Sequence, residues 1–482
     1  MNQVTHYYTG KGMSTFCKMK LDRIIKDLYL HRACRKYFFC LVKSLIYLRL
    51  YNIILFAAAF FLIPYYALRI ILTGKYKKSI GPKFGFILPD VIKGMKGSPR
   101  IWVHAVSVGE VTAAAPIVSS LREIFPHACI VLSTSTETGQ EMALRIVPAA
   151  TSYIYYPLDI PFVIRKVINL VNPDIFVPVE TEIWPNFIRI CREKDIKVVM
   201  VNGRISPRSF KKYLKTRFFW KKILAYVDEM GMISEIDANR IKTMGVGISR
   251  VHVMGNAKYD SLAARADTTL KEEMAETLNI DPGSKVFVAG STHEGEEKVV
   301  LKVYKKLLEK YPDFMLIIIP RHIERREEVL SCAKEEGFSD CITMTEINGG
   351  KRRTKERVII IDVIGELFKV YSLATVVFCG GSLVPKGGQN ILEPAAWGKV
   401  IFYGPSMEDF MDEKRLLEEA GAGMTIMNEE ELLRKIQTMT EDPGTLTLKG
   451  EAGRKVVASN MGASRRYAEM VKNLIMRQSR KG

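Results

Sequence analysis

The chain has 482 residues, 48% of them hydrophobic, and a formal net charge of +19. This length exceeds one ordinary domain and predicts roughly two or three. The first 100 residues hold 18 Lys and Arg against three Asp, so 15 of the 19 net charges lie there. The remainder is nearly balanced, which argues against a nucleic-acid enzyme with a basic cleft and for an N-terminus that meets an anionic partner.

Residues 1–48 form a basic extension with no clear periodicity. We expect either a variable extension or sequence upstream of a later start, with Met13 or Met19 as candidates. Elsewhere the eight Cys show no C-x-x-C spacing and the seven His form no ligand-like pair. These patterns indicate a reducing compartment and predict neither a disulfide framework nor a metal site.

Residues 49–78 contain an uncharged apolar run, Ile53 to Leu68, with cations on both sides. The run is shorter than the roughly 20 residues needed to span a bilayer, and Pro64 would kink a helix there. We therefore expect a membrane-anchor helix that lies in an anionic leaflet, with a true span as the second alternative. A signal peptide is the third, because the run starts late and lacks a small-residue cleavage site.

From residue 79 onward, short apolar runs alternate with helix-like stretches, a pattern typical of parallel sheets covered on both faces. A polar stretch from Leu262 to Leu278 separates two such series. We therefore predict an α/β chain with two facing Rossmann-like domains, 79–260 and 261–462, a deep cleft between them, and a final helix in 463–482 that packs back across both. The predicted strands are Ile101–Val106, Cys129–Ser133, Tyr153–Tyr156, Ile175–Val179, Val198–Asn202, Met230–Ser234, Val251–Gly255, Val286–Ala289, Phe314–Pro320, Val358–Asp362, Thr375–Gly380, Val400–Tyr403 and Gly423–Met427.

In the first domain, polar residues follow the ends of several predicted strands. Glu110 comes where the first strand passes into a helix, and the positive end of that helix would keep its carboxylate deprotonated, as a general base requires. The alternative is an ordinary first-turn helix carboxylate. Glu180 and Glu182 follow another strand; in an extended chain they share a face, so one should face the cleft and one should brace the loop. The next strand is followed by Arg204, which adds a cation, whereas the hydroxyl-rich segment 133–139 is better explained as helix capping.

In the second domain, three strand ends carry residues suited to a nucleotide phosphate. The first loop contains Ser291, His293 and Glu294, and the second contains Arg321 and His322. The third is glycine-rich and places amides of 388–391 near a helix start, where an anion is stabilised; its candidate residues are Gly387, Gly388, Asn390 and Glu393. The chain has no GxxxxGK[ST], GxGxxG or Asp-x-Asp motif, so we expect neutralisation by amides, Arg and Lys without a metal or other cofactor.

These motifs, in this order, resemble the 3-deoxy-D-manno-octulosonic acid (Kdo) transferase family over roughly residues 70 to 475. The matching segments are VHAVSVGE (103–110), STETG (135–139), ETEIWPN (180–186), NGRIS (202–206), GNAKYD (255–260), STHEGEE (291–297), PRH (320–322) and GGSLVPKGGQNILEPAAWG (380–398). The resemblance implies the glycosyltransferase B (GT-B) fold. It also implies inverting transfer of Kdo from a CMP-Kdo donor to the lipid A precursor, in lipopolysaccharide synthesis, on the cytoplasmic face of the inner membrane.

The resemblance also implies residue roles. Glu110, preceded by Gly109, matches the catalytic base, and Glu182 matches a second acceptor-domain carboxylate. Lys258 and Arg321 match basic donor-site residues, and Glu393 matches the glutamate that binds ribose. Gln389 departs from the pattern, because His is common there. The rivals are another GT-B enzyme with a UDP-sugar donor and a non-catalytic protein that binds a nucleotide sugar or lipid; no nucleic-acid partner is expected.

Overall fold

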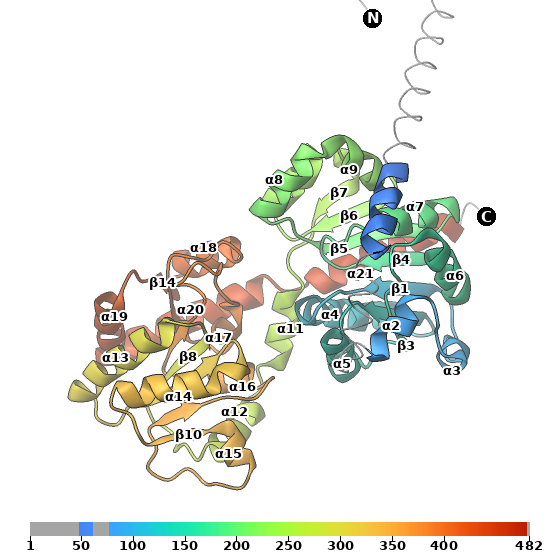
Figure 1. Ribbon diagram of the computed structural model, residues 1–482. Helices are drawn as coiled ribbons and strands as arrows, with labels where there is room; N and C mark the ends of the chain where they lie inside the picture. Colours follow the sequence, from blue (N-terminus) through green and yellow to red (C-terminus); the bar gives the residue numbers. More distant parts are fainter. Residues whose placement is uncertain (1–47, 61–76, 480–482) are drawn as a thin grey trace, which may run out of the picture.

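The computed structural model describes residues 48–60 and 77–479 (Figure 1). The basic extension and the second half of the expected anchor segment lie outside the described residues. Within the described ranges, two parallel sheets of seven strands form two α/β domains. The predicted two-domain α/β fold is therefore confirmed.

The first sheet has the strand order β3-β2-β1-β4-β5-β6-β7. Its strands read as nearly continuous apolar runs because helices cover both faces; in β1, Trp102 and Val103 are fully buried. Its strands are β1 (Arg100–His104), β2 (Cys129–Thr134), β3 (Ser152–Tyr155), β4 (Ile175–Pro178), β5 (Lys197–Gly203), β6 (Glu229–Met232) and β7 (Val251–Val253). Its helices are α2 (Lys77–Lys83), α3 (Pro89–Lys93), α4 (Val108–Ile124), α5 (Glu137–Ile146), α6 (Pro161–Val171), α7 (Pro185–Glu193), α8 (Pro207–Lys215), α9 (Arg217–Leu224) and α10 (Glu235–Thr243), with a 3-10 turn at Ile248–Arg250.

The second sheet has the order β10-β11-β9-β8-β12-β13-β14. Its strands are β8 (Val286–Thr292), β9 (Met315–Pro320), β10 (Cys341–Thr343), β11 (Val358–Ile360), β12 (Val376–Cys379), β13 (Val400–Tyr403) and β14 (Gly423–Thr425). Its helices are α12 (Thr268–Thr277), α13 (Glu296–Lys310), α14 (Arg326–Glu335), α15 (Met344–Asn348), α16 (Leu367–Tyr371), α17 (Leu392–Ala396), α18 (Met411–Glu419), α19 (Glu429–Glu441) and α20 (Pro443–Ser459), with a 3-10 turn at Ile323–Arg325. The sequence prediction missed β10, a three-residue strand at the edge of the sheet.

Each sheet reverses its strand order once, and this decides where a ligand can bind. In the first sheet the reversal lies between β1 and β4, and in the second between β8 and β12. Ligands of open parallel sheets bind at the carboxyl ends of the strands on either side of such a reversal. The segments after β1 and β4 carry Glu110 and Glu182, and the segment after β8 carries His293.

Two helices connect the domains (Figure 1). α11 (Lys258–Arg265) follows the first sheet, and α21 (Ala463–Ser479) returns from the second domain to pack on α4. Tyr467 of α21 is fully buried there, and its hydroxyl donates to the Gly255 carbonyl at 2.7 Å. The last helix of the chain therefore completes the core of the first domain.

Residues 48–60 form a helix that lies beside α7 and α9 (Figure 1). The Tyr51 hydroxyl donates to buried Asp159 at 2.8 Å, and Asn186 Nδ2 donates to Asn52 Oδ1 at 2.7 Å. The Tyr51 ring also lies 6.0 Å from the Phe219 ring. In the part of the chain that the structure describes, no helix is both long and apolar enough to cross a membrane.

Candidate active site

Three carboxylates gather where the first sheet reverses. Glu110 lies in the first turn of α4, and Glu180 and Glu182 lie in the loop after β4. Glu110 is 9% exposed; its carboxylate accepts the Val106 N–H at 2.7 Å and the Ser107 hydroxyl at 3.1 Å. These bonds fix the carboxylate over the end of β1, as a positioned general base requires.

The ionisation of Glu110 differs from the sequence expectation. Burial, followed by the nearby charge of Glu180 and a smaller effect of Glu182, raises the pKa of Glu110 to about 8. The hydrogen bonds from Val106 and Ser107 lower this pKa but do not compensate. The prediction that the helix start keeps Glu110 ionised is therefore wrong, because desolvation and like charge outweigh the helix dipole.

Glu180 and Glu182 do not divide their roles as an extended chain would. Glu180 adopts a left-handed backbone, with φ of +61°, and pairs with Lys258 Nζ at 3.0 Å. Glu182 accepts the Trp184 indole N–H at 3.0 Å, and burial raises its pKa to about 6. Both residues line the same cleft, so the structure does not show the expected division into one residue that faces the cleft and one that braces the loop.

The cleft has a volume of about 540 Å³ and lies between the two domains. The first domain contributes Glu180, Thr181, Glu182, Arg204, Ile205, Ser206, Ser209 and Tyr213, and the second contributes Lys386, Gly388, Gln389, Asp409 and Phe410. The charged groups of the first-domain side are Glu180, Glu182 and Arg204, and those of the second-domain side are Lys386 and Asp409, so carboxylates and cations face one space.

In the second domain, a buried carboxylate holds the glycine-rich loop in place. Glu296 is 1% exposed and accepts four backbone N–H groups: those of His293 at 2.9 Å, Gly381 at 2.7 Å, Ser382 at 3.0 Å and Leu383 at 2.9 Å. The sequence prediction selected Glu294, which is exposed and has no hydrogen bond among the described residues. The signal for Glu296 was its position three residues after His293, at a helix start, where a carboxylate caps backbone amides.

His293 lies at the centre of a cationic group. Burial lowers its pKa, the charge of Glu296 opposes this, and the neighbouring His322, Lys386 and Arg321 lower the pKa further. The His293 and His322 rings are 5.9 Å apart, and the buried Nε2 of His293 has no partner in the described residues. A buried nitrogen without a partner beside several cations is suited to an oxyanion or a sugar hydroxyl.

The remaining predicted donor-site residues lie around the same loop. The Ser291 backbone is left-handed, with φ of +55°. Gly387 and Gly388 have positive φ, and a Cβ on Gly388 would lie 2.4 Å from Met407 Sδ. The Gly388 amide donates to the Gly381 carbonyl at 2.8 Å, so the expectation that this amide faces a phosphate is wrong. Asn390 Nδ2 donates to Glu393 at 3.1 Å, which places these two side chains together.

Gly109 is exposed, and a Cβ built on it would have no atom of the protein within 4 Å. The lack of a side chain at residue 109 therefore keeps open the space next to Glu110 and is not required by packing.

No group of three or more potential ligands suited to a metal ion occurs in the described ranges.

Comparison with known proteins places this arrangement in a family. The family model described as 3-Deoxy-D-manno-octulosonic-acid transferase (kdotransferase) matches residues 78–261. A 3-deoxy-D-manno-octulosonic acid transferase of Haemophilus influenzae is 31% identical over 410 residues, which are 84% of this chain and 93% of that protein. The chain belongs to the Kdo transferase family. A relative from Rickettsia typhi with the same description is 28% identical over 77% of this chain and 79% of its own length.

A further relative is longer. The bifunctional glycosyltransferase/methyltransferase of Fusobacterium nucleatum is 33% identical over 350 residues, which are 72% of this chain and 54% of that protein. This Kdo transferase family member therefore spans about half the length of that relative.

Solved structures share the two-domain fold at low identity. UDP-GlcNAc 2-epimerase from Neisseria meningitidis, bound to UDP-GlcNAc, matches with a TM-score of 0.55 and 14% identity, over 78% of this chain and all of that one. A glycosyltransferase from Rickettsia africae matches with a TM-score of 0.53 and 16% identity, over 78% of this chain and 98% of that one. These likenesses support the GT-B-like arrangement of the domains.

Proposed function

We propose that this member of the Kdo transferase family moves Kdo from CMP-Kdo to a sugar hydroxyl of the lipid A precursor, with inversion. The observation that carries the proposal is the position of Glu110, a buried and hydrogen-bonded carboxylate at the reversal of the acceptor-domain sheet. Family membership supports Kdo as the transferred sugar; the lipid A precursor as acceptor is part of the proposal.

In the proposed reaction, the acceptor hydroxyl oxygen forms a bond to the anomeric carbon of Kdo. The bond from that carbon to the phosphate oxygen breaks, CMP leaves with the bonding electrons, and the hydroxyl proton passes to Glu110. A pKa of about 8 makes Glu110 a strong base once it is ionised, and general base catalysis typically contributes about 10²–10⁴-fold.

The departing phosphate needs positive charge on the opposite wall. We assign this role to Arg321 and Lys386, whose charges both act on the adjacent His293. Glu182 completes the acceptor side, and Lys258, expected as a donor-site cation, instead pairs with Glu180 on that side at 3.0 Å. Preorganised charge of this kind stabilises the charge that grows in the transition state.

Mass spectrometry of the product, after incubation with CMP-Kdo and the lipid A precursor, tests this function. We expect one or more Kdo units on the lipid and release of CMP. Product from a UDP-sugar but not from CMP-Kdo would favour the other GT-B activities. The absence of any product, together with intact nucleotide binding, would favour a binding protein.

We further propose that the enzyme works on the cytoplasmic leaflet of the inner membrane, with residues 49–78 in the lipid interface. The helix at 48–60 exposes Leu50, Ile53, Ile54, Phe56 and Phe60. Beside it, the segment 207–224, which forms α8 and α9, carries seven Lys and Arg and no acidic residue. Apolar side chains next to clustered cations favour an anionic bilayer surface, with about 1 kcal/mol for each cation near the lipid.

Co-sedimentation with vesicles tests this location. Changing Lys211, Lys212 and Lys215 to Gln should weaken binding to vesicles with anionic lipid and leave binding to neutral vesicles unchanged. The control changes Lys298, Lys305 and Lys306, on α13 of the second domain, to Gln. Equal effects of the two triple variants would refute the assigned surface.

A further inference from the structure

Arg204 is a cation in the cleft whose guanidinium forms no close ion pair with a carboxylate of the described residues. It lines the cleft on the first-domain side, but no ion pair or side-chain hydrogen bond of Arg204 occurs among the described residues. The second domain offers it the Phe410 ring, whose centroid is 5.8 Å from the guanidinium carbon. The nearest charge effect is on Glu413: burial raises the pKa of this carboxyl, the charge of Arg204 opposes the rise, and the carboxylate accepts from Asn256 Nδ2 at 3.3 Å.

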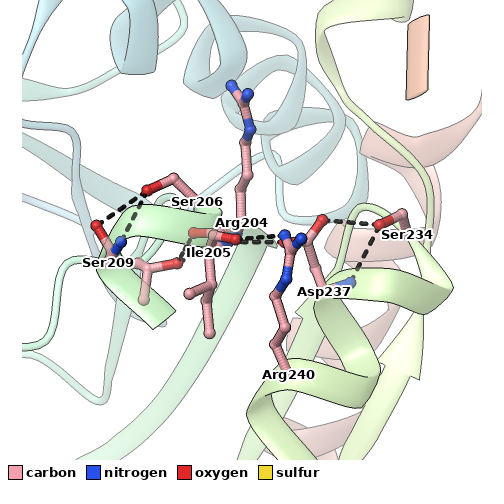
Figure 2. A network of polar contacts seen from close by, with 8 residues as sticks. Arg204, Ile205, Ser206, Ser209, Ser234, Asp237 and Arg240 are labelled. Carbon is pink, nitrogen blue, oxygen red and sulfur yellow. Dashed lines mark hydrogen bonds and ion pairs between the residues drawn. The ribbon is translucent and has the colours of Figure 1, made fainter. Parts of the chain in front are cut away.

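The backbone on both sides of Arg204 is fixed by a buried network (Figure 2). The Ile205 N–H donates to Asp237 Oδ1 at 2.8 Å, and Arg240 Nη1 donates to the Ile205 carbonyl at 2.6 Å. The Arg204 N–H donates to Thr181 Oγ1 at 3.2 Å, and the Thr181 hydroxyl donates to the Arg204 carbonyl. Asp237 is 3% exposed, so this network is part of the core and not a surface turn.

Figure 2 shows the Arg204 side chain extending away from this network while its backbone is held within it. The guanidinium has no hydrogen-bond acceptor among the described residues, so its N–H groups are available to a ligand, and a planar oxyanion can accept from them in bidentate geometry. The acidic residues that line the cleft are Glu180, Glu182 and Asp409; Glu180 pairs with Lys258, and none of the three forms an ion pair with Arg204. The fold therefore holds the backbone of Arg204 in place and directs its cationic side chain to the cleft, where an anion can bind.

We propose that Arg204 is a substrate-binding residue that takes an oxyanion of one of the two substrates, and that Asp237 and Arg240 are its positioning residues. The inference rests on the proposed function and adds a residue to its binding set. Two groups share the required chemistry: the carboxylate of the donor sugar and a phosphate of the lipid acceptor.

The test compares Arg204→Gln and Arg204→Lys with the wild-type chain, with separate KM values for CMP-Kdo and for the lipid acceptor. We expect Arg204→Gln to lower kcat/KM by about 10- to 100-fold, the effect of losing hydrogen bonds to a charged group. The kcat/KM of Arg204→Lys should lie between those of Arg204→Gln and the wild type, because an ammonium keeps the charge but cannot donate in planar bidentate geometry. Arg192→Gln is the control, since Arg192 is exposed on α7 and does not line the cleft.

Two arms identify the source of the oxyanion. If the acceptor supplies it, enzymatic removal of acceptor phosphate should abolish the difference between Arg204→Gln and the wild type. If the donor supplies it, the difference should persist and appear in the KM for CMP-Kdo. Unchanged kcat and KM values in Arg204→Gln, while the wild type transfers Kdo, would overturn the proposal, whereas a wild type that makes no Kdo-lipid would overturn the proposed function.

The positioning role has its own signature. Asp237→Asn should raise the same KM as Arg204→Gln, and the double variant should raise it no further than Arg204→Gln alone. Additive losses in the double variant, with a reduced melting temperature, would show that Asp237 serves only the stability of the fold.

Discussion

Replacing Glu110 with Gln should stabilise the protein at high pH while it removes the catalytic base. The pKa of Glu110 is raised from 4.5 to about 8, first by burial and then by the charges of Glu180 and Glu182. A raised carboxyl pKa means that the folded state binds more protons than the unfolded state between these values. The free energy of unfolding of the wild type should therefore fall as the pH rises through this window.

The magnitude of this change in the free energy of unfolding follows from the shift in the pKa of Glu110. One pKa unit corresponds to 1.36 kcal/mol, so a shift of roughly 3.5 units gives at most about 5 kcal/mol between pH 4 and pH 9. Roughly 3 kcal/mol of this is present at pH 7. Gln accepts one of the two hydrogen bonds that Val106 and Ser107 now donate, and the lost bond offsets about 1 kcal/mol. We expect the variant to equal the wild type near pH 5 and to exceed its stability by several kcal/mol at pH 9.

Urea unfolding at pH 5, 7 and 9, followed by Trp fluorescence, measures this difference. Trp102, Trp184 and Trp220 lie in the first domain and only Trp397 in the second, so the signal reports mainly on the domain that contains Glu110. Glu123→Gln, an exposed change on the same helix, is the control and should alter stability by less than about 0.5 kcal/mol at every pH. A difference between Glu110→Gln and wild type that does not change with pH would refute the reasoning.

The raised pKa of Glu110 also predicts how the rate of transfer depends on pH. Transfer by the wild type should rise with pH to a midpoint near 8, because only the ionised Glu110 accepts a proton. Glu110→Gln should bind CMP normally and show no transfer at any pH.

Three further changes test other parts of the site. Lys258→Ala leaves the Glu180 charge unpaired beside Glu110, so the midpoint of the pH–rate profile should move upward; an unchanged midpoint would contradict the coupling. Gly109→Ala should keep or slightly raise the melting temperature, since its Cβ meets no protein atom, yet should reduce transfer by narrowing the space beside Glu110. Glu296→Gln should lower the stability of the second domain by about 1–3 kcal/mol, because an amide cannot accept all four N–H groups; a melting curve equal to that of the wild type would argue against this bracing role.

Much of the fold could be predicted because parallel strands covered on both faces must be apolar along their whole length. That rule located thirteen of the fourteen strands in the described residues, and it failed only at Cys341–Thr343, a short edge strand. The position of Glu110 at a strand end followed from the same pattern. The roles of the predicted site residues stay predictions until they are tested.

The amino-acid sequence by itself determined the alternation of strands and helices, the family and the residue types at the strand ends, since these are local patterns. Only the tertiary structure decided how those residues act on one another. It buries Glu110 and brings Glu180 and Glu182 near it, and both effects raise its pKa, opposite to the expected direction. It makes Glu296, and not Glu294, the support of the glycine-rich loop, and it turns Arg204 into the cleft. Charge coupling and desolvation depend on distance and burial, and neither exists before the chain has folded.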